Sequence, residues 1–170
     1  MITPDYARHM ARYNAWQNQW MFQAADGLTK AQRQEDKGAF WGSIEATLSH
    51  LMWGDTLWIA RFDGGEGPEM GLDTSTAHNW PRMMANRPLL DARIAAWAWS
   101  TDASDFEGIL HWHSDALKRD FSMLKSVCIM QLFNHQTHHR GQVHGMLTAL
   151  GVKTDDTDIP FMPDDVPEWR

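Results

Sequence analysis

Histidines are the residues whose spacing in this sequence most directly indicates chemistry. Four of the nine histidines fall in the stretch NHQTHHRGQVH, residues 134–144. At about 100° per residue in a helix, His135 and His139 lie about 40° and one turn apart, so both imidazoles can reach one metal ion. His138 and His144 project in other directions, and we expect structural or surface roles for them. The spacing predicts a chelating pair that needs a third ligand.

Two places in the sequence can supply that third ligand. His50 stands in the apolar run SHLMW, where an imidazole without a partner would be desolvated at a cost in free energy. His111 and His113 compete for the role, because alternate residues of a strand point to the same side and can also chelate. We favour His50 and keep the strand pair as the alternative. Gln136 replaces the glutamate of the metalloprotease motif H-E-x-x-H, which removes the general base of that chemistry.

Several polar or small residues near these histidines have simpler explanations than catalysis. Asp55 is expected to be a solvated or capping acid, with a second-shell contact to a histidine as the alternative. Gln142 shares the face of the chelating pair and either lines the site or orients water or ligand there. We expect Arg140 to pair with an acid between helices, and Gly141 to allow a close approach of helices.

Four amphipathic stretches are the elements that must position the histidines. Apolar residues recur at intervals of three and four, and the stretches begin at capping residues or prolines such as Thr3, Ser43 and Pro88. Gly151 is a suitable stop for the last of them. The pattern predicts helices over about 3–26, 43–63, 88–102 and 123–150.

The segments between these helices differ in character. Residues 63–87 contain four glycines and no sustained period, which predicts a long loop with a short helical turn near Trp80 that could cover a site. Residues 106–122 alternate in places, which favours a short two-stranded excursion. The acidic, proline-rich tail is expected to form an irregular surface arm, with Phe161 and Trp169 available to dock on the helices.

Length and composition limit the classes of protein to consider. The 170 residues, 43% of them hydrophobic, suit one domain spanning residues 1–170 with one core, and four helices predict an all-α four-helix bundle. A net charge of -7 argues against a nucleic-acid partner. Without a run of about 18 apolar residues, we expect no membrane span and a cytoplasmic protein. The single cysteine, Cys128, cannot form an internal disulfide and is expected to be an inert buried thiol.

Three stretches of the sequence resemble the DinB/YfiT-like family of four-helix-bundle metalloproteins over nearly the whole chain. They are YNAWQNQW at 13–20, GSIEATLSHLMWGDTLWIARF at 42–62 and NHQTHHRGQVHGMLTALG at 134–151. The resemblance implies a bundle with a long crossover loop, a divalent metal ion bound by His50, His135 and His139, and a homodimer. The tail DIPFMPDD departs from the aliphatic ending expected in that family.

A site of three imidazoles has a definite chemical character. Neutral ligands leave a divalent ion its full charge and at least one open position, and they suit Zn²⁺ first, with Ni²⁺ or Fe²⁺ as alternatives. The resemblance implies a metal-dependent transferase that activates a low-molecular-weight thiol, such as bacillithiol or mycothiol, for attack on a small electrophilic substrate. The alternatives are a metal-dependent hydrolase using a metal-bound hydroxide and a non-enzymatic metal-binding stress protein.

Overall fold

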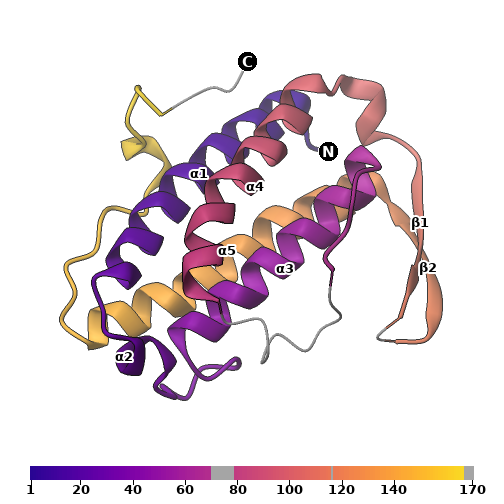
Figure 1. The fold of residues 1–170 in the computed structure, drawn as a ribbon. Coiled ribbons are helices and arrows are strands. Elements are labelled where there is room, and N and C mark those ends of the chain that lie inside the picture. The colour runs from indigo at the N-terminus through magenta and orange to yellow at the C-terminus, as the bar shows by residue number, and fades with distance from the viewer. Residues whose placement is uncertain (70–78, 116, 167–170) are drawn as a thin grey trace.

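Four long helices dominate the computed structural model, which describes residues 1–69, 79–115 and 117–166. Within these residues the chain also forms a five-residue helix α2, a two-stranded antiparallel sheet and two short 3-10 helices at 103–106 and 159–161. The helices are α1 (Pro4–Asp26), α2 (Lys30–Gln34), α3 (Ile44–Asp63), α4 (Trp80–Ser100) and α5 (Lys125–Ala149), as Figure 1 shows. The predicted helices over 3–26, 43–63 and 123–150 are confirmed.

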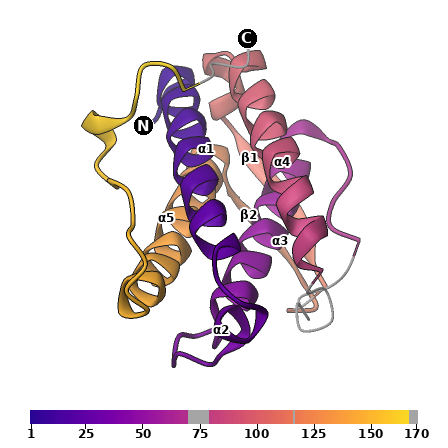
Figure 2. The same ribbon diagram turned by 60° about the vertical axis from the view of Figure 1, so that its left-hand side comes forward.

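The four long helices pack around one shared apolar interior. α1 contacts α4 and α5, and α3 contacts the same two helices, so each long helix has two long neighbours. Two views of the ribbon show this arrangement (Figures 1 and 2). Completely buried side chains from three of the helices meet between them, among them Leu48, Leu51, Ile94, Leu132 and Leu147. None of the helices within the described residues is long and apolar enough to cross a bilayer.

Local capping explains where α1 and α3 begin and where α3 ends. Thr3 accepts a hydrogen bond from the backbone N–H of Tyr6, and Ser43 accepts one from the backbone N–H of Ala46. Each bond satisfies an N–H group that has no partner within its own helix. Gly64 ends α3 with a φ of 72°, a left-handed conformation that glycine adopts without strain.

The third helix begins earlier than the sequence predicts. We expected it to open at Pro88, but α4 starts at Trp80, and Asn79 caps it by accepting a hydrogen bond from the backbone N–H of Arg82. Pro81 occupies the first turn, where its missing N–H costs nothing. Pro88 therefore lies inside a 21-residue helix, which tolerates the loss of one internal hydrogen bond because the buried face of α4 is held by the core.

The predicted loop is correspondingly shorter. The helical turn expected near Trp80 is the first turn of α4, and residues 79–87 are helix or cap rather than loop. Residues 70–78 of that predicted loop lie outside the described part of the chain.

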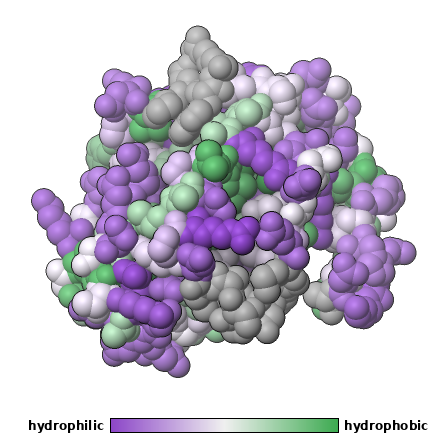
Figure 3. Space-filling model, viewed as in Figure 1, coloured by the Kyte–Doolittle hydropathy of each residue, from purple (hydrophilic) through white to green (hydrophobic). Residues whose placement is uncertain are grey.

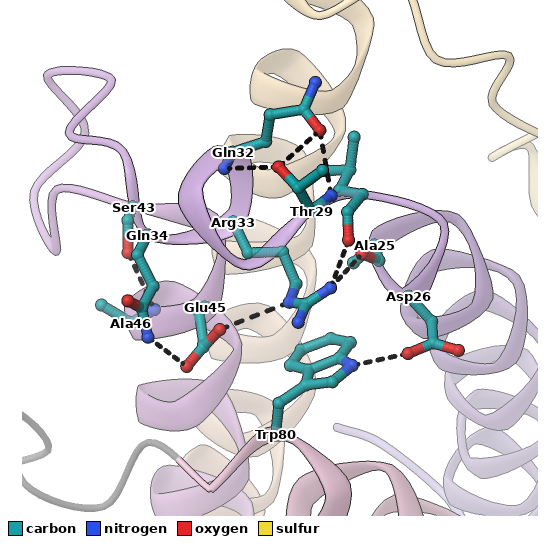
Figure 4. Close-up of polar contacts among 11 residues, drawn as sticks. Ala25, Asp26, Thr29, Gln32, Arg33, Gln34, Ser43, Glu45, Ala46 and Trp80 are labelled. Carbon is teal, nitrogen blue, oxygen red and sulfur yellow. Dashed lines mark hydrogen bonds and ion pairs between the residues drawn. The ribbon is translucent and has the colours of Figure 1, made fainter.

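A polar network joins α2 to the starts of α3 and α4 (Figure 4). The Arg33 guanidinium lies 4.6 Å from the ring of Trp80 and donates to Glu45 at 3.4 Å, while the indole N–H of Trp80 donates to Asp26 at 2.7 Å. Glu45 is buried, and Gln34 of α2 also donates to it at 3.0 Å. No helix was predicted between the helices expected over 3–26 and 43–63, yet α2 lies there, with a capping box that begins at Thr29.

The two-stranded excursion predicted for 106–122 is confirmed as a β-hairpin. β1 (Ile109–Ser114) pairs with β2 (Arg119–Leu124), and Trp112 lies opposite Phe121. Trp112 packs edge to face on Trp58 of α3, which fixes the hairpin against the helices. The tip of the hairpin extends away from them with a hydrophilic surface, at the lower right of Figure 3.

The chain after α5 runs back along α1 (Figure 2). Tyr13 donates its hydroxyl to the carbonyl of Thr157 at 2.8 Å, and Gln17 donates to the carbonyl of Asp156 at 2.9 Å. The expected arm is therefore held against α1 through backbone acceptors. Phe161 is 64% exposed, and Trp169 lies outside the described residues.

Candidate metal centre

The structure brings His50, His135 and His139 together from two packed helices. His50 lies on α3, and the other two lie one turn apart on α5. One ring nitrogen from each histidine falls within 4.8 Å of the other two, so the group could hold a metal ion. The i, i+4 spacing on α5 and the apolar setting of His50 were the signals that predicted this grouping.

The distances within the cluster suit a single ion. Nε2 of His50 lies 3.0 Å from Nε2 of His135, and the centroids of the His135 and His139 rings are 4.4 Å apart. Two imidazole nitrogens that bind one ion at about 2.0–2.1 Å are separated by about 2.9 Å at right angles and about 3.3 Å at the tetrahedral angle. The observed His50–His135 separation falls between these values, so this pair of donors fits either geometry.

Gln142 fixes the orientation of His139. The side-chain oxygen of Gln142 accepts a hydrogen bond from Nδ1 of His139 at 2.8 Å, one turn further along α5. Because a carbonyl oxygen only accepts, the proton of the neutral ring sits on Nδ1 and the lone pair is on Nε2. Orientation of His139 is a role that was not considered for Gln142, which was expected to line the site or to orient water or ligand there.

Aromatic rings shield His50. The ring of Trp41 stacks on the imidazole with centroids 4.0 Å apart, and Trp53 lies at 6.0 Å in a nearly parallel orientation. His50 itself is buried. Trp41 belongs to the connector before α3, where no period or motif in the sequence marks it as part of the site. Only the folded chain brings it there.

The cluster keeps its imidazoles uncharged. Burial lowers the pKa of His50 to about 3, and the neighbouring His135 and His139 lower it further because adjacent positive charges repel. Burial likewise lowers the pKa of His135 to about 4, with His139 and His138 acting in the same direction. The pKa of His139 is also lowered by burial. At neutral pH the three nitrogens therefore carry lone pairs for a cation rather than protons.

A glycine on α3 makes room for His135. A Cβ placed on Gly54 would lie 2.6 Å from Cε1 of His135 and 3.1 Å from its Nδ1, closer than real side chains approach. Gly141, for which we expected a close helix approach, has nothing within 4 Å of such an atom and is exposed. The close approach predicted for Gly141 is therefore wrong, and the sequence analysis did not single out Gly54.

The remaining histidines have other partners. His144 contacts Thr154 at 2.9 Å, and His138 is exposed, as expected for structural and surface residues. His111 and His113 project from the exposed face of β1, where His111 contacts Ser122 at 2.7 Å and His113 contacts Asp120 at 2.7 Å. Among the described residues, the strand pair forms no cluster of three possible ligands.

Asp55 belongs to a buried ionic network rather than to the solvent. It accepts a hydrogen bond from Arg87 at 2.7 Å, and Arg87 also donates twice to Asp91. Asn18 of α1 donates to Asp91 at 2.9 Å, so three helices share the network. The expectation of a solvated or capping acid is therefore wrong. Although Asp55 lies only five residues from His50, its carboxylate is paired with the guanidinium of Arg87.

Arg140 and Cys128 complete the neighbourhood on α5. Arg140 is buried, its guanidinium lies 5.3 Å from the ring of Tyr13, and burial lowers its pKa to about 10. The ion pair expected for Arg140 is not found among the described residues.

Cys128 is buried as expected, and burial raises the pKa of its thiol.

Comparisons with known proteins agree with this geometry. A family model described as the DinB family matches residues 1–169. Searches of curated proteins and of solved structures gave no match. The match extends over all four long helices and includes the three clustered histidines. The chain belongs to the DinB family.

Proposed function

We propose that the protein is a four-helix bundle that holds one divalent metal ion through His50, His135 and His139. We further propose that it activates a low-molecular-weight thiol at this site for attack on a small electrophilic substrate. The observation that carries the proposal is the cluster itself, three imidazole nitrogens within 4.8 Å of one another, with no carboxylate or thiolate among them. Zn²⁺ is the expected ion, with Ni²⁺ or Fe²⁺ as alternatives.

Neutral metal ligands favour the activation of a thiol, because they leave the positive charge of the ion undiminished. When bound, a divalent ion that keeps its full charge lowers the pKa of a coordinated thiol or water. Three protein donors leave at least one coordination position for such a group. Because burial keeps His50 and His135 unprotonated, the site accepts a cation at neutral pH without first losing protons.

The surrounding residues give the site its rigidity and limit its access to water. Gln142 directs the lone pair of His139, and Gly54 lets the His135 ring lie close to α3. Trp41 stacks on His50 and Trp53 lies nearly parallel to it, so these rings place apolar surface beside a buried ligand.

Proton handling also favours a thiol over water as the nucleophile. In the proposed transfer the sulfur forms a bond to the electrophilic carbon, the leaving group departs with its electron pair, and the thiol proton passes to solvent. The two acids nearest in sequence to His50 are Glu45 and Asp55, and each already accepts a hydrogen bond from an arginine, Arg33 and Arg87 respectively. Hydrolysis would gain more from a general base than the attack of an already acidic thiol.

Elemental analysis of the untagged protein tests the metal site. We expect about one equivalent of metal in the wild type, with the loss of most of it in His50→Ala and His139→Ala. His138→Ala is the matched control, because His138 lies on the same helix but is exposed. Retention of metal in His50→Ala, together with its loss in a His111→Ala/His113→Ala double variant, would move the site to the hairpin.

A turnover assay then separates the three functional classes. The metal-loaded protein is incubated with a panel of small electrophiles, with and without cysteine, bacillithiol or mycothiol, and loss of free thiol is measured. We expect turnover that requires both thiol and metal and that is absent in His139→Ala. Product formation without thiol would indicate the hydrolase, and metal binding without turnover would indicate the non-enzymatic protein.

The proposal includes a homodimer, as the family resemblance implies. Light scattering of the metal-loaded protein should give about twice the chain mass of 19.5 kDa. A concentration-independent monomer would remove the dimer from the proposal and leave the metal site unaffected.

A further inference from the structure

A cavity lies toward the opposite end of α3 from the histidine cluster. Its volume is about 340 Å³, and it opens between the ends of α3 and α4 and the start of α5, where Arg61, Phe62, Trp97, Lys125 and Ile129 line it. We call it the distal cavity. Arg61 follows His50 by 11 positions on α3, which places the two about 16 Å apart along the helix axis. The volume falls within the range of small-molecule sites.

Arg61 is a half-buried cation without an acidic partner. Its guanidinium lies 4.6 Å from the ring of Trp58 and 5.0 Å from the ring of Trp112. Its side chain forms no hydrogen bond or ion pair with any residue that the structure describes. Burial lowers the pKa of Arg61, with Cys128 acting in the opposite direction. The two rings offset part of the cost of desolvation but leave the N–H donors of the guanidinium unused.

Lys125 supplies a second cation at the same cavity. It is half-buried at the first position of α5, and its backbone N–H donates to the carbonyl of Gly108. Across the described part of the chain, its ammonium group has no carboxylate partner. Two basic side chains on different helices therefore line one cavity with their charges available.

The acids at the distal cavity do not neutralise these cations. Asp63 is held by Arg93 through two hydrogen bonds of 2.7 and 2.9 Å, which lower its pKa. Asp105 is exposed, where water screens its charge, and it accepts a hydrogen bond from the backbone N–H of Asp102. An incoming anion would therefore meet Arg61 and Lys125 as the unpaired charges inside.

Aromatic and aliphatic side chains form another part of the lining, beside two hydroxyl groups. Phe62 and Trp97 stack with ring centroids 5.2 Å apart, and Ile129 is buried beside them. The hydroxyls of Ser100 and Thr101 donate to carbonyls of α4 and so are not free as donors. A ligand that matches these surfaces has one acidic group for the two cations and an apolar or aromatic body for the walls.

We propose that the distal cavity binds a small organic anion with an apolar or aromatic body, whose acidic group contacts Arg61 and Lys125. The site is separate from the histidine cluster, so occupation of one does not require the other. Aromatic carboxylates and sulfonates that are small enough for the cavity have both of these features.

Fluorescence titration with 8-anilinonaphthalene-1-sulfonate, an aromatic anion, tests the proposal on the full-length protein. We expect saturable binding of one equivalent, weakened at least ten-fold in an Arg61→Gln/Lys125→Gln double variant. Arg119→Gln is the matched control, since this exposed arginine of the hairpin lies over Phe121 outside the cavity. Lys125→Gln alone removes a half-buried charge and should weaken binding even if the double variant does not fold.

Two further comparisons decide the place and the chemistry of binding. His50→Ala should bind the probe as tightly as the wild type, because the cluster is at the other end of α3. The neutral analogue N-phenyl-1-naphthylamine should bind at least ten-fold more weakly than the sulfonate. Equal affinity of the folded double variant and the wild type, or equal affinity for the neutral analogue, would overturn the proposal.

Discussion

The imidazole of His135 lies directly against the backbone of Gly54, so that a Cβ at position 54 would come within 2.6 Å of Cε1 of His135. Gly54 follows His50 by one turn on α3, and the two residues therefore present the same face of the helix to α5. In the proposed metal centre, His50 supplies one ligand, and Gly54 leaves the space for a second, His135. The glycine thus links the packing of two helices to the geometry of the proposed metal centre.

Gly54→Ala should weaken metal binding without unfolding the protein. The added methyl group displaces the His135 ring, while alanine favours the helix by up to about 1 kcal/mol over glycine. We expect a loss of affinity of about 10- to 100-fold, the range for disturbed positioning of a ligand, measured by competition with a chromogenic chelator. Gly145→Ala is the control, because nothing lies within 4 Å of a Cβ there. Equal affinities in the two variants would show that His135 does not depend on this space.

Gln142→Ala should also weaken metal binding, for a different reason. Loss of the acceptor at 2.8 Å frees the Nδ1 proton of His139 and lets the ring rotate or change tautomer. We expect a metal affinity about 10- to 100-fold lower, the range found when a residue that hydrogen-bonds to a metal ligand is removed. Gln142→Glu retains an acceptor and should restore most of it. If Gln142→Glu and Gln142→Ala weaken metal binding equally, the orienting role assigned to Gln142 is wrong.

Local spacing predicted one part of the site and could not predict another. The His135–His139 pair follows from helix geometry alone, because both residues belong to one uninterrupted helix. His50 was favoured from its apolar neighbours and from the family resemblance. The stacking of Trp41 and the space at Gly54 depend on how α3 meets α5 and its preceding connector. Such contacts between segments distant in sequence leave no periodic signal.

The same distinction applies to the fold. Capping at Thr3 and Ser43 is local, and α1 and α3 begin where the sequence predicts. Pro88 suggested a helix start, yet the Asn79 cap and Pro81 provided a competing start signal seven residues earlier, and tertiary packing carries α4 through the later proline. The buried partnership of Asp55 with Arg87 joins two helices and could not be inferred from either alone.

Chelation should lower the melting temperature of the protein. An ion that binds only the folded chain stabilises it by about 2.7 kcal/mol when present at 100 times its dissociation constant. For a chain of this size, that corresponds to about 5–10 °C, which calorimetry with and without a chelator measures. The difference should disappear in His135→Ala and persist in His138→Ala. Its persistence in His135→Ala would show that the ion stabilises the chain elsewhere.

The metal-free protein should lose stability in mild acid. The pKa values of His50 and His135 lie near 3 and 4 in the folded chain but near 6.5 when unfolded, so the unfolded state binds more protons between these values. Stability is therefore fully present above about pH 6.5 and falls as pH decreases toward 4. We expect urea unfolding of chelated protein to show a loss on the order of 1–3 kcal/mol between pH 7.5 and 5.5. A His50→Ala/His135→Ala variant should lose clearly less, and an equal loss would assign the effect to other groups.

Arg87→Met should destabilise the fold far more than the loss of a partly exposed ion pair. Arg87 and Asp55 are both buried, and removal of the guanidinium leaves Asp55 and Asp91 as uncompensated charges or forces them to take up protons. We expect a loss of about 3–5 kcal/mol in the free energy of unfolding. Arg93→Met is the matched control on the same helix, because the Arg93–Asp63 pair is partly exposed and is worth about 0–1 kcal/mol. Urea denaturation of both variants measures the difference. Similar losses would mean that neighbouring polar groups, such as Asn18, compensate for the missing guanidinium.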